Sequence, residues 1–239
     1  MNWLSNEESI TEPSVFAVSL EGKTAVICFA NDFYDHLKAA FELADARDAP
    51  GIAGGLKGTM SSDVVLYHCC FGAPAAGLHL EGLIASGVDR VIMAGSAGSI
   101  SPTARVGSIV LPTWGIREEG TSYHYLPAET DCRPSADLLQ EIRGVMGLER
   151  VSEGGVWTTD AALRETKEKV KQYAKRGVLA VDMECTALMA IALYRNVQFA
   201  AVLVITDELF EGEWRRGFRS KGVERAKKIV AERIRRVLK

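Results

Sequence analysis

Short runs of β-branched and apolar residues alternate along this chain with segments of helical periodicity, and this alternation constrains the fold more than any other feature. The runs are nearly continuous in apolar character, as strands buried on both faces are. Strands that alternate with helices predict one α/β domain with a central mixed, mostly parallel sheet flanked by helices. The predicted strands cover 23–30, 64–72, 91–95, 107–112, 177–183 and 198–206, and the predicted helices cover 33–46, 75–86, 161–176 and 185–195.

Two of the helical segments carry the clearest local signals. Asp160 precedes 161–176 as an N-cap residue would, and Gly177 follows it where a helix C-terminus favours glycine. The segment 221–239 has eight basic and two acidic residues, with apolar residues at helical spacing. We expect it to be an amphipathic helix that docks by its apolar face and leaves its basic face in solvent.

Composition excludes several classes of protein. The formal net charge is only −3, which does not suit a protein that coats nucleic acid, and no run of about 18 apolar residues predicts a membrane span. The acidic start of the chain lacks the basic-then-apolar pattern of a signal peptide, so we expect a cytoplasmic protein. The length fits a single domain over 1–239, in which 1–20 is an N-terminal extension.

Cysteine and histidine spacing gives no sign of a metal site. The five cysteines are odd in number and form no C-x-x-C pair, so we expect buried, reduced thiols. The four histidines are scattered, and we expect no metal. These residues are Cys28, Cys69, Cys70, Cys132 and Cys185, and His36, His68, His79 and His124.

In α/β sheets ligands bind beyond the carboxyl ends of the strands, so the residues there are the first candidates for chemistry. The segment 94–98 contains Gly95 and Ser96 directly after a predicted strand. Its small residues and backbone N–H groups suit an anion or a sugar oxygen. It lacks the dinucleotide fingerprint, and no histidine follows His124 to complete a serine triad.

Two carboxylates flank Met183 at a predicted strand-to-helix junction. Asp182 and Glu184 point to the same face of an extended strand, where their oxygens suit sugar hydroxyls. The alternative is that they cap the following helix and complement its positive end. The sequence leaves both interpretations open.

Two further segments have a functional and a structural interpretation. Thr206 and Asp207 end a buried apolar run, where an acid is either functional or a solvated turn residue. Trp157 and Thr158 suit a planar base and its edge, or else a core tryptophan before an N-cap.

Together these segments resemble the purine nucleoside phosphorylase and uridine phosphorylase superfamily, which also holds methylthioadenosine nucleosidases. The resemblance runs over 24–238, almost the whole chain. It implies a partly barrel-like sheet and a homo-oligomer, a dimer or a trimer of dimers, with sites near subunit interfaces. Its most specific pieces are 95–99, 107–112, 181–184 and 206–207, with a glycine-x-proline turn at 72–74.

The resemblance implies cleavage of the bond between ribose C1′ and a base nitrogen, with no metal or organic cofactor. Met183 and Glu184 match positions under the ribose, and Asp182 stands where the family has glutamate. Asp207 matches the acid that protonates purine N7, which Arg219, or Arg216 in its place, would support. The other implied substrate contacts are Gly95, Ser96, Trp157, Thr158 and Thr206.

Phosphorylases hold phosphate with arginines because a dianion needs bidentate cationic donors. Met93 replaces one such arginine, and none stands in the turn at 29–33 or near Pro50. Arg47, Arg117 or Arg164 could reach phosphate from other directions, and Arg117 stands in a polar segment that resembles a loop lining the site of some phosphorylases. Asp32 or Asp35 could activate water, as a nucleosidase would require.

We therefore predict an enzyme that uses phosphate to release the base of a purine nucleoside and form ribose 1-phosphate. The alternatives are a nucleosidase that uses water instead, and a protein that binds a nucleoside without cleaving it. We expect a small-molecule nucleoside as its partner, and neither nucleic acid nor a membrane.

Overall fold

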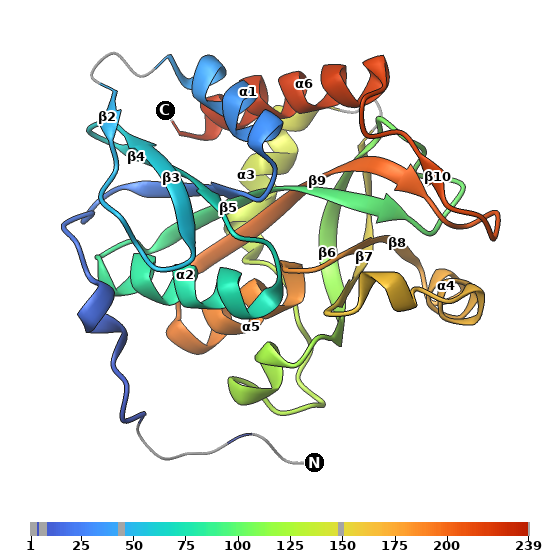
Figure 1. Ribbon diagram of the computed structural model, residues 1–239, viewed down its shortest axis with the longest axis horizontal. Helices are drawn as coiled ribbons and strands as arrows, with labels where there is room; N and C mark the ends of the chain where they lie inside the picture. Colours follow the sequence, from blue (N-terminus) through green and yellow to red (C-terminus); the bar gives the residue numbers. More distant parts are fainter. Residues whose placement is uncertain (1–3, 5–8, 43–45, 148–150, 239) are drawn as a thin grey trace.

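The computed structural model of the chain describes Leu4 and residues 9–42, 46–147 and 151–238. In these residues ten strands form one sheet in the order β10-β9-β6-β7-β8-β5-β1-β4-β3-β2 (Figure 1). The strands are β1 (Thr24–Cys28), β2 (Arg47–Asp48), β3 (Gly55–Met60), β4 (Val64–Cys69), β5 (Arg90–Ser99), β6 (Ile109–Glu118), β7 (Val151–Thr159), β8 (Val178–Asp182), β9 (Gln198–Glu208) and β10 (Arg215–Arg216).

The sheet is partly closed into a barrel because β5 is long enough to pair with three neighbours. Its first half lies parallel to β1, its whole length lies parallel to β9, and Gly98 and Ser99 also pair antiparallel with β8. The pairings β9–β6, β6–β7 and β7–β8 complete a ring of five strands. The mixed, mostly parallel and partly barrel-like sheet predicted from the sequence is therefore confirmed.

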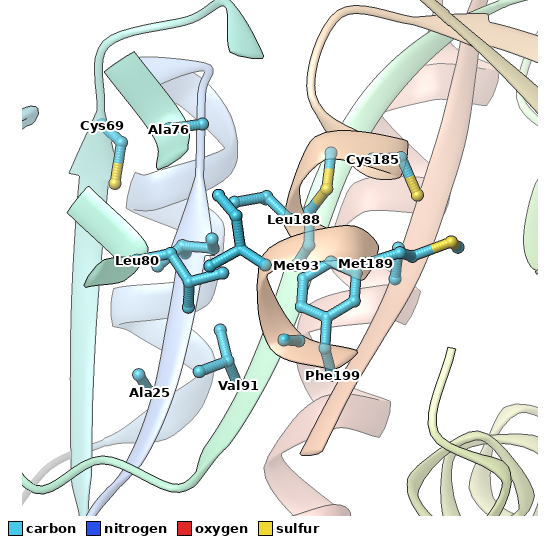
Figure 2. Packing of buried hydrophobic residues seen from close by; sticks show 14 of the residues in the cluster. Ala25, Cys69, Ala76, Leu80, Val91, Met93, Cys185, Leu188, Met189 and Phe199 are labelled. Atoms are coloured by element: carbon cyan, nitrogen blue, oxygen red, sulfur yellow. The ribbon is translucent and has the colours of Figure 1, made fainter. Parts of the chain in front are cut away.

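Helices cover both faces of the sheet. In Figure 1, α1, α3 and α6 lie on one side, and α2 and α5 pack side by side on the other. Figure 2 shows the second layer, in which Leu80 of α2 and Leu188 of α5 meet Met93 of β5. The helices are α1 (Asn31–Phe41), α2 (Ala73–Ala85), α3 (Ala136–Met146), α4 (Lys167–Ala174), α5 (Cys185–Arg195) and α6 (Lys221–Val237), with 3-10 turns η1 (Pro13–Phe16), η2 (Thr121–His124) and η3 (Ala162–Arg164).

The helix predicted at 161–176 is shorter than its sequence signals indicate. It divides into η3 and α4, and the N-cap is Thr166, whose hydroxyl accepts a hydrogen bond from Lys169 N at 3.3 Å. The side chain of Asp160 accepts one from Gly120 N at 2.8 Å instead. Thr166 therefore caps helix α4, and the carboxylate of Asp160 holds the loop at Gly120 instead of capping a helix. The connection between η3 and α4 consequently contains Glu165.

The sequence prediction omits β3, β7 and α3, and it places the ends of β5 and β6 too early. β3 and β7 each contain two glycines, which interrupt the apolar run that would mark a buried strand. The C-terminal helix is confirmed as α6, with Ser220 as its N-cap, while Lys239 lies outside the described residues. Part of the predicted extension at 1–20 also lies outside them.

The described cysteines are free thiols, and all but the half-buried Cys70 are buried, as the sequence predicts. None of the helices in the described ranges combines the length and apolarity needed to cross a bilayer.

Candidate functional site

A pocket of about 520 Å³ opens at the carboxyl ends of β1, β5, β8 and β9. This is the edge of the sheet at which α/β folds bind ligands. Its described lining contains four carboxyl groups and no lysine, arginine or histidine. The lining residues are Phe29, Ala30, Phe71, Ser96, Ala97, Gly98, Ala162, Leu163, Glu165, Val181, Asp182, Met183, Glu184, Thr206, Asp207, Leu209, Trp214 and Phe218.

Glu184 is a buried carboxyl group directly on the pocket wall. Its Oε1 accepts a hydrogen bond from Gly72 N at 2.6 Å, across the turn between β4 and α2. Burial, and then the charge of Asp182, raise the pKa of Glu184 to about 8. A ligand hydroxyl could give the group a second polar partner beside Gly72 N.

Asp182 acts as a cap for helix α5. Its Oδ2 accepts hydrogen bonds from Cys185 N at 2.8 Å and Glu184 N at 3.3 Å, and its Oδ1 accepts one from Thr158 Oγ1 at 2.6 Å. Burial nevertheless raises the pKa of Asp182. Because both oxygens have protein partners, the geometry matches the capping alternative considered for this residue.

Ser96 has a buried hydroxyl with no hydrogen-bond partner in the described residues, and it lines the pocket. Buried hydroxyl groups are normally paired, so this one needs a ligand or water as its partner. Met183 lines the pocket beside Glu184 and gives it an apolar surface.

Asp207 lies where β9 departs from regular pairing with β5. Ala97 pairs with Ile205 and Gly98 pairs with Asp207, so Thr206 is an extra residue in β9. Such bulges change the direction of neighbouring side chains, and here both Thr206 and Asp207 line the pocket. A Cβ atom on Gly98 would lie 3.1 Å from Asp207 Oδ2, so the glycine leaves room for the carboxylate.

The carboxylate of Asp207 is held by two donors. Trp214 Nε1 donates a hydrogen bond to Oδ2 at 2.8 Å, and Thr206 Oγ1 lies 2.9 Å from Oδ1. Arg219, predicted to support this acid, is exposed and lies outside the pocket lining. Arg216 pairs with Asp207 in the ladder between β10 and β9, and its side chain stacks on the Trp214 ring, with its guanidinium carbon 5.5 Å from the ring centre.

Glu165 is a pocket residue that the sequence analysis missed. It lies between η3 and α4 and lines the same pocket as Asp207. Burial, and then repulsion from Asp207, raise its pKa to about 7. No local motif marks this residue, because its closeness to Asp207 arises only from the folded chain.

Trp157 and Thr158 lie in the protein interior and outside the pocket lining. Trp157 is fully buried, donates a hydrogen bond from Nε1 to Glu118 Oε2 at 2.6 Å and packs edge-on against Tyr173. Thr158 holds Asp182 as described above. The structure therefore places Trp157 where its core interpretation expects it, and Trp214, Phe218, Phe71 and Phe29 supply the aromatic lining instead.

Of the three candidates for the nucleophile region, Ser96 lines the pocket, whereas Arg117 and Asp32 lie outside the lining. The guanidinium group of Arg117 is buried and donates to Ser122 Oγ and to the carbonyl oxygens of Leu126 and Pro127. Its role is to hold the loop after β6. Asp32 forms an ion pair with the buried Lys227 of α6. The side chains of Arg117 and Asp32 therefore have partners outside the pocket.

Gly95 is buried within β5 and does not line the pocket. A Cβ atom there would lie 2.8 Å from the side chains of Leu203 and Met93. The glycine therefore permits close packing of β5 on β9, and Gly98 is the glycine that shapes the pocket.

Comparisons with known proteins find relatives of this chain. A family model described as "Phosphorylase superfamily" matches residues 26–239. The chain is 31% identical over 175 residues to a purine nucleoside phosphorylase DeoD-type of Bacillus cereus, covering 71% of this chain and 72% of that protein. It is 28% identical over 153 residues to a guanosine phosphorylase of Halorubrum lacusprofundi, covering 63% of this chain and spanning 64% of that protein's length.

The fold matches solved structures over nearly the whole chain. The crystal structure of a uridine phosphorylase from Vibrio fischeri superposes with a TM-score of 0.76 at 20% identity, covering 97% of each chain.

Proposed function

Because the chain belongs to the phosphorylase superfamily, we propose that it cleaves the bond between the ribose and the base of a purine nucleoside in the pocket described above. The observation that carries this proposal is that one cavity contains two groups of side chains, one suited to a ribose and the other to a purine. Met183, Glu184 and Ser96 form the first group, and Asp207 and Trp214 belong to the second. A volume of about 520 Å³ lies within the range of small-molecule sites.

The first group suits a ribose. The carboxyl group of Glu184 can hydrogen-bond sugar hydroxyls, and the thioether of Met183 can pack against the apolar face of the ring. The unpaired hydroxyl of Ser96 gains a partner when a sugar or an incoming oxygen nucleophile occupies the pocket.

The second group suits a purine. Trp214 and Phe218 meet edge-on, with ring centres 6.1 Å apart, at the exposed side of the pocket, where they can pack against a flat base. A carboxyl group beside the imidazole ring of a purine can hydrogen-bond it or protonate N7, which makes the base a better leaving group. Asp207 and Glu165 are the carboxyl groups available on this side.

We infer the nucleophile from the charge of the residues that line the pocket. A phosphate dianion in this pocket would meet four carboxyl groups and no cation from the described lining, whereas water carries no charge that needs balancing. The lining of the single chain therefore favours hydrolysis, which yields ribose and the free base.

Phosphorolysis is the second candidate, and two observations favour it. Both sequence relatives above are named as phosphorylases. In addition, helix α1 begins at the pocket edge beside Ala30 without a side chain capping it from the N-cap position, and N–H groups at a helix start attract anions; one of them, Phe33 N, already donates to Asp32 Oδ1 at 2.8 Å. A cation from a second copy of the chain would then have to balance the phosphate.

One assay distinguishes these functions. The purified chain is incubated with adenosine, inosine, guanosine, methylthioadenosine or uridine, with and without inorganic phosphate, and free base is measured. Release of purine at equal rates without phosphate, with free ribose as product, is the result we expect. Release that requires phosphate and yields ribose 1-phosphate establishes phosphorolysis. Release from none of the nucleosides refutes the proposed function and leaves binding alone.

A further inference from the structure

We propose, building on the proposed function, that Glu165 is the general acid that protonates the departing base, and that Asp207 is the carboxylate that orients it. The two groups line the same pocket but have opposite hydrogen-bonding environments. When the environments of two neighbouring carboxyl groups differ in this way, the group that favours its neutral form is the acid.

Asp207 is placed as an acceptor. The indole N–H of Trp214 can only donate, and it points at Asp207 Oδ2 at 2.8 Å. The hydroxyl of Thr206 lies 2.9 Å from the other oxygen. Both oxygens therefore have donors beside them, which is how a protein holds a carboxylate that accepts hydrogen bonds.

Glu165 has no such support. Within the described part of the chain no N–H or O–H group donates to its carboxyl group. It lies half-buried in the connection that leads to the N-cap Thr166, next to the exposed Leu163. Burial, and then the charge of Asp207, raise its pKa to about 7, so a large share of Glu165 carries a proton near neutral pH.

The charged groups around Glu165 come from several elements. Asp207 of β9 repels it, and Asp182 and Glu184 add two further carboxyl groups to the pocket wall. Two cations of neighbouring segments contact other groups: Arg216 stacks on Trp214, and Lys167 lies beside Gly212. No cation from the described lining stabilises an ionised Glu165.

In the proposed step, Glu165 gives its proton to the base as the bond to the ribose breaks. The O–H bond of Glu165 breaks and an N–H bond forms at purine N7. The C1′–N9 bond breaks, and its electron pair stays with the base. C1′ bonds to an oxygen of the nucleophile, which is phosphate in the phosphorolytic reaction or water in the hydrolytic one. With water, an O–H bond of the attacking molecule then breaks, and its proton passes to solvent. Because Glu165 is only half-buried, it regains its proton from solvent after the base leaves.

The test compares Glu165→Gln with the unaltered chain on guanosine and on 7-methylguanosine. The methyl group already blocks N7, so this base leaves without a proton. We expect kcat/KM for guanosine to fall by roughly 10²- to 10⁴-fold, the usual contribution of a general acid. We expect the 7-methylguanosine rate to change less than about threefold, since that step needs no acid. Equal losses on both substrates, or no loss on guanosine, overturn the assignment.

The pH profile provides a second, independent readout. In the unaltered chain kcat/KM should fall as pH rises through about 7, because Glu165 loses its proton. Glu165→Gln should abolish this limb, and Asp207→Asn should move it to lower pH, since removing a like charge lowers the pKa of its neighbour. A limb that stays in place in Asp207→Asn overturns the pairing.

The controls separate folding from chemistry. Glu165→Asp keeps a carboxyl group and should recover part of the guanosine rate, while circular dichroism and nucleoside binding show whether Glu165→Gln is folded. A chain that cleaves guanosine normally after Glu165→Gln refutes this inference alone. An unaltered chain that cleaves no nucleoside refutes the proposed function, and the inference with it.

Discussion

Glu184 should make the unliganded protein less stable as pH rises, and Glu184→Gln should remove that dependence. Glu184 is buried, and its pKa is raised from 4.5 to about 8, first by burial and then by the charge of Asp182. Below pH 4.5 the group is protonated in both the folded and unfolded states, so its contribution to stability is fully present there. Between pH 4.5 and about 8 the unfolded state ionises first, and stability is lost.

The magnitude follows from the same values. One pKa unit corresponds to about 1.4 kcal/mol, so a pKa raised from 4.5 to about 8 corresponds to a loss of about 5 kcal/mol for an isolated group. Asp182 shares the repulsion, so we expect about 2–4 kcal/mol to be attributable to Glu184 alone. The amide in Glu184→Gln can still accept the hydrogen bond from Gly72 N but cannot ionise.

The assay is urea unfolding at several pH values from 5 to 8.5. The unaltered chain should lose stability across this range, and Glu184→Gln should show a flatter profile and be the more stable protein at pH 8.5. Glu129→Gln, at an exposed glutamate, serves as the control and should reproduce the unaltered slope. Parallel profiles for the unaltered chain and Glu184→Gln would refute the assignment of a raised pKa to Glu184.

Three further predictions concern the pocket itself. Near neutral pH, Glu184→Gln should weaken ribonucleosides by about two- to tenfold but 2′-deoxynucleosides less, because a pKa of about 8 leaves Glu184 largely protonated and a neutral hydrogen bond contributes about 0.5–1.5 kcal/mol; equal losses in KM would exclude a hydroxyl contact. Gly98→Ala should lower kcat/KM for purine nucleosides, because its Cβ would lie 3.1 Å from the carboxylate at the end of β9, while Gly144→Ala, with nothing within 4 Å, should leave kinetics unchanged. Trp214→Phe should raise KM with little effect on stability, whereas Trp157→Phe should lower the unfolding free energy by about 1–2 kcal/mol and leave KM unchanged, as measured by kinetics and urea unfolding.

Much of the fold could be predicted from the sequence because its strands are buried on both faces. The strands β1, β4, β8 and β9 produce nearly continuous apolar runs that need no knowledge of their neighbours. β7 could not be recognised in this way, since Gly154 and Gly155 interrupt its apolar pattern. A Cβ atom on Gly155 would lie 2.5 Å from the ring of Trp114, so packing explains that glycine only after the strand is paired.

Some residues of the pocket could likewise be predicted from the sequence, and others could not. Asp207, Glu184, Met183 and Ser96 all follow or end buried apolar runs, and the sequence therefore assigns them to one edge of the sheet. Trp157 carries an equally good local signal, yet its side chain points into the core and bonds Glu118. In a strand alternate residues face opposite sides, and only the closed barrel decides which side is the interior.

The sequence by itself determined the alternation of strands and helices, the edge of the sheet at which the pocket lies, and the acids at the ends of β8 and β9. These features depend on local polarity and on spacing along the chain. Only the tertiary structure decided that Trp214 holds Asp207, that Arg117 and Asp32 are occupied elsewhere, and that Glu165 lies close enough to Asp207 to be repelled by it. Burial and repulsion between charges depend on distance in space, and residues distant in sequence approach one another only when the chain has folded.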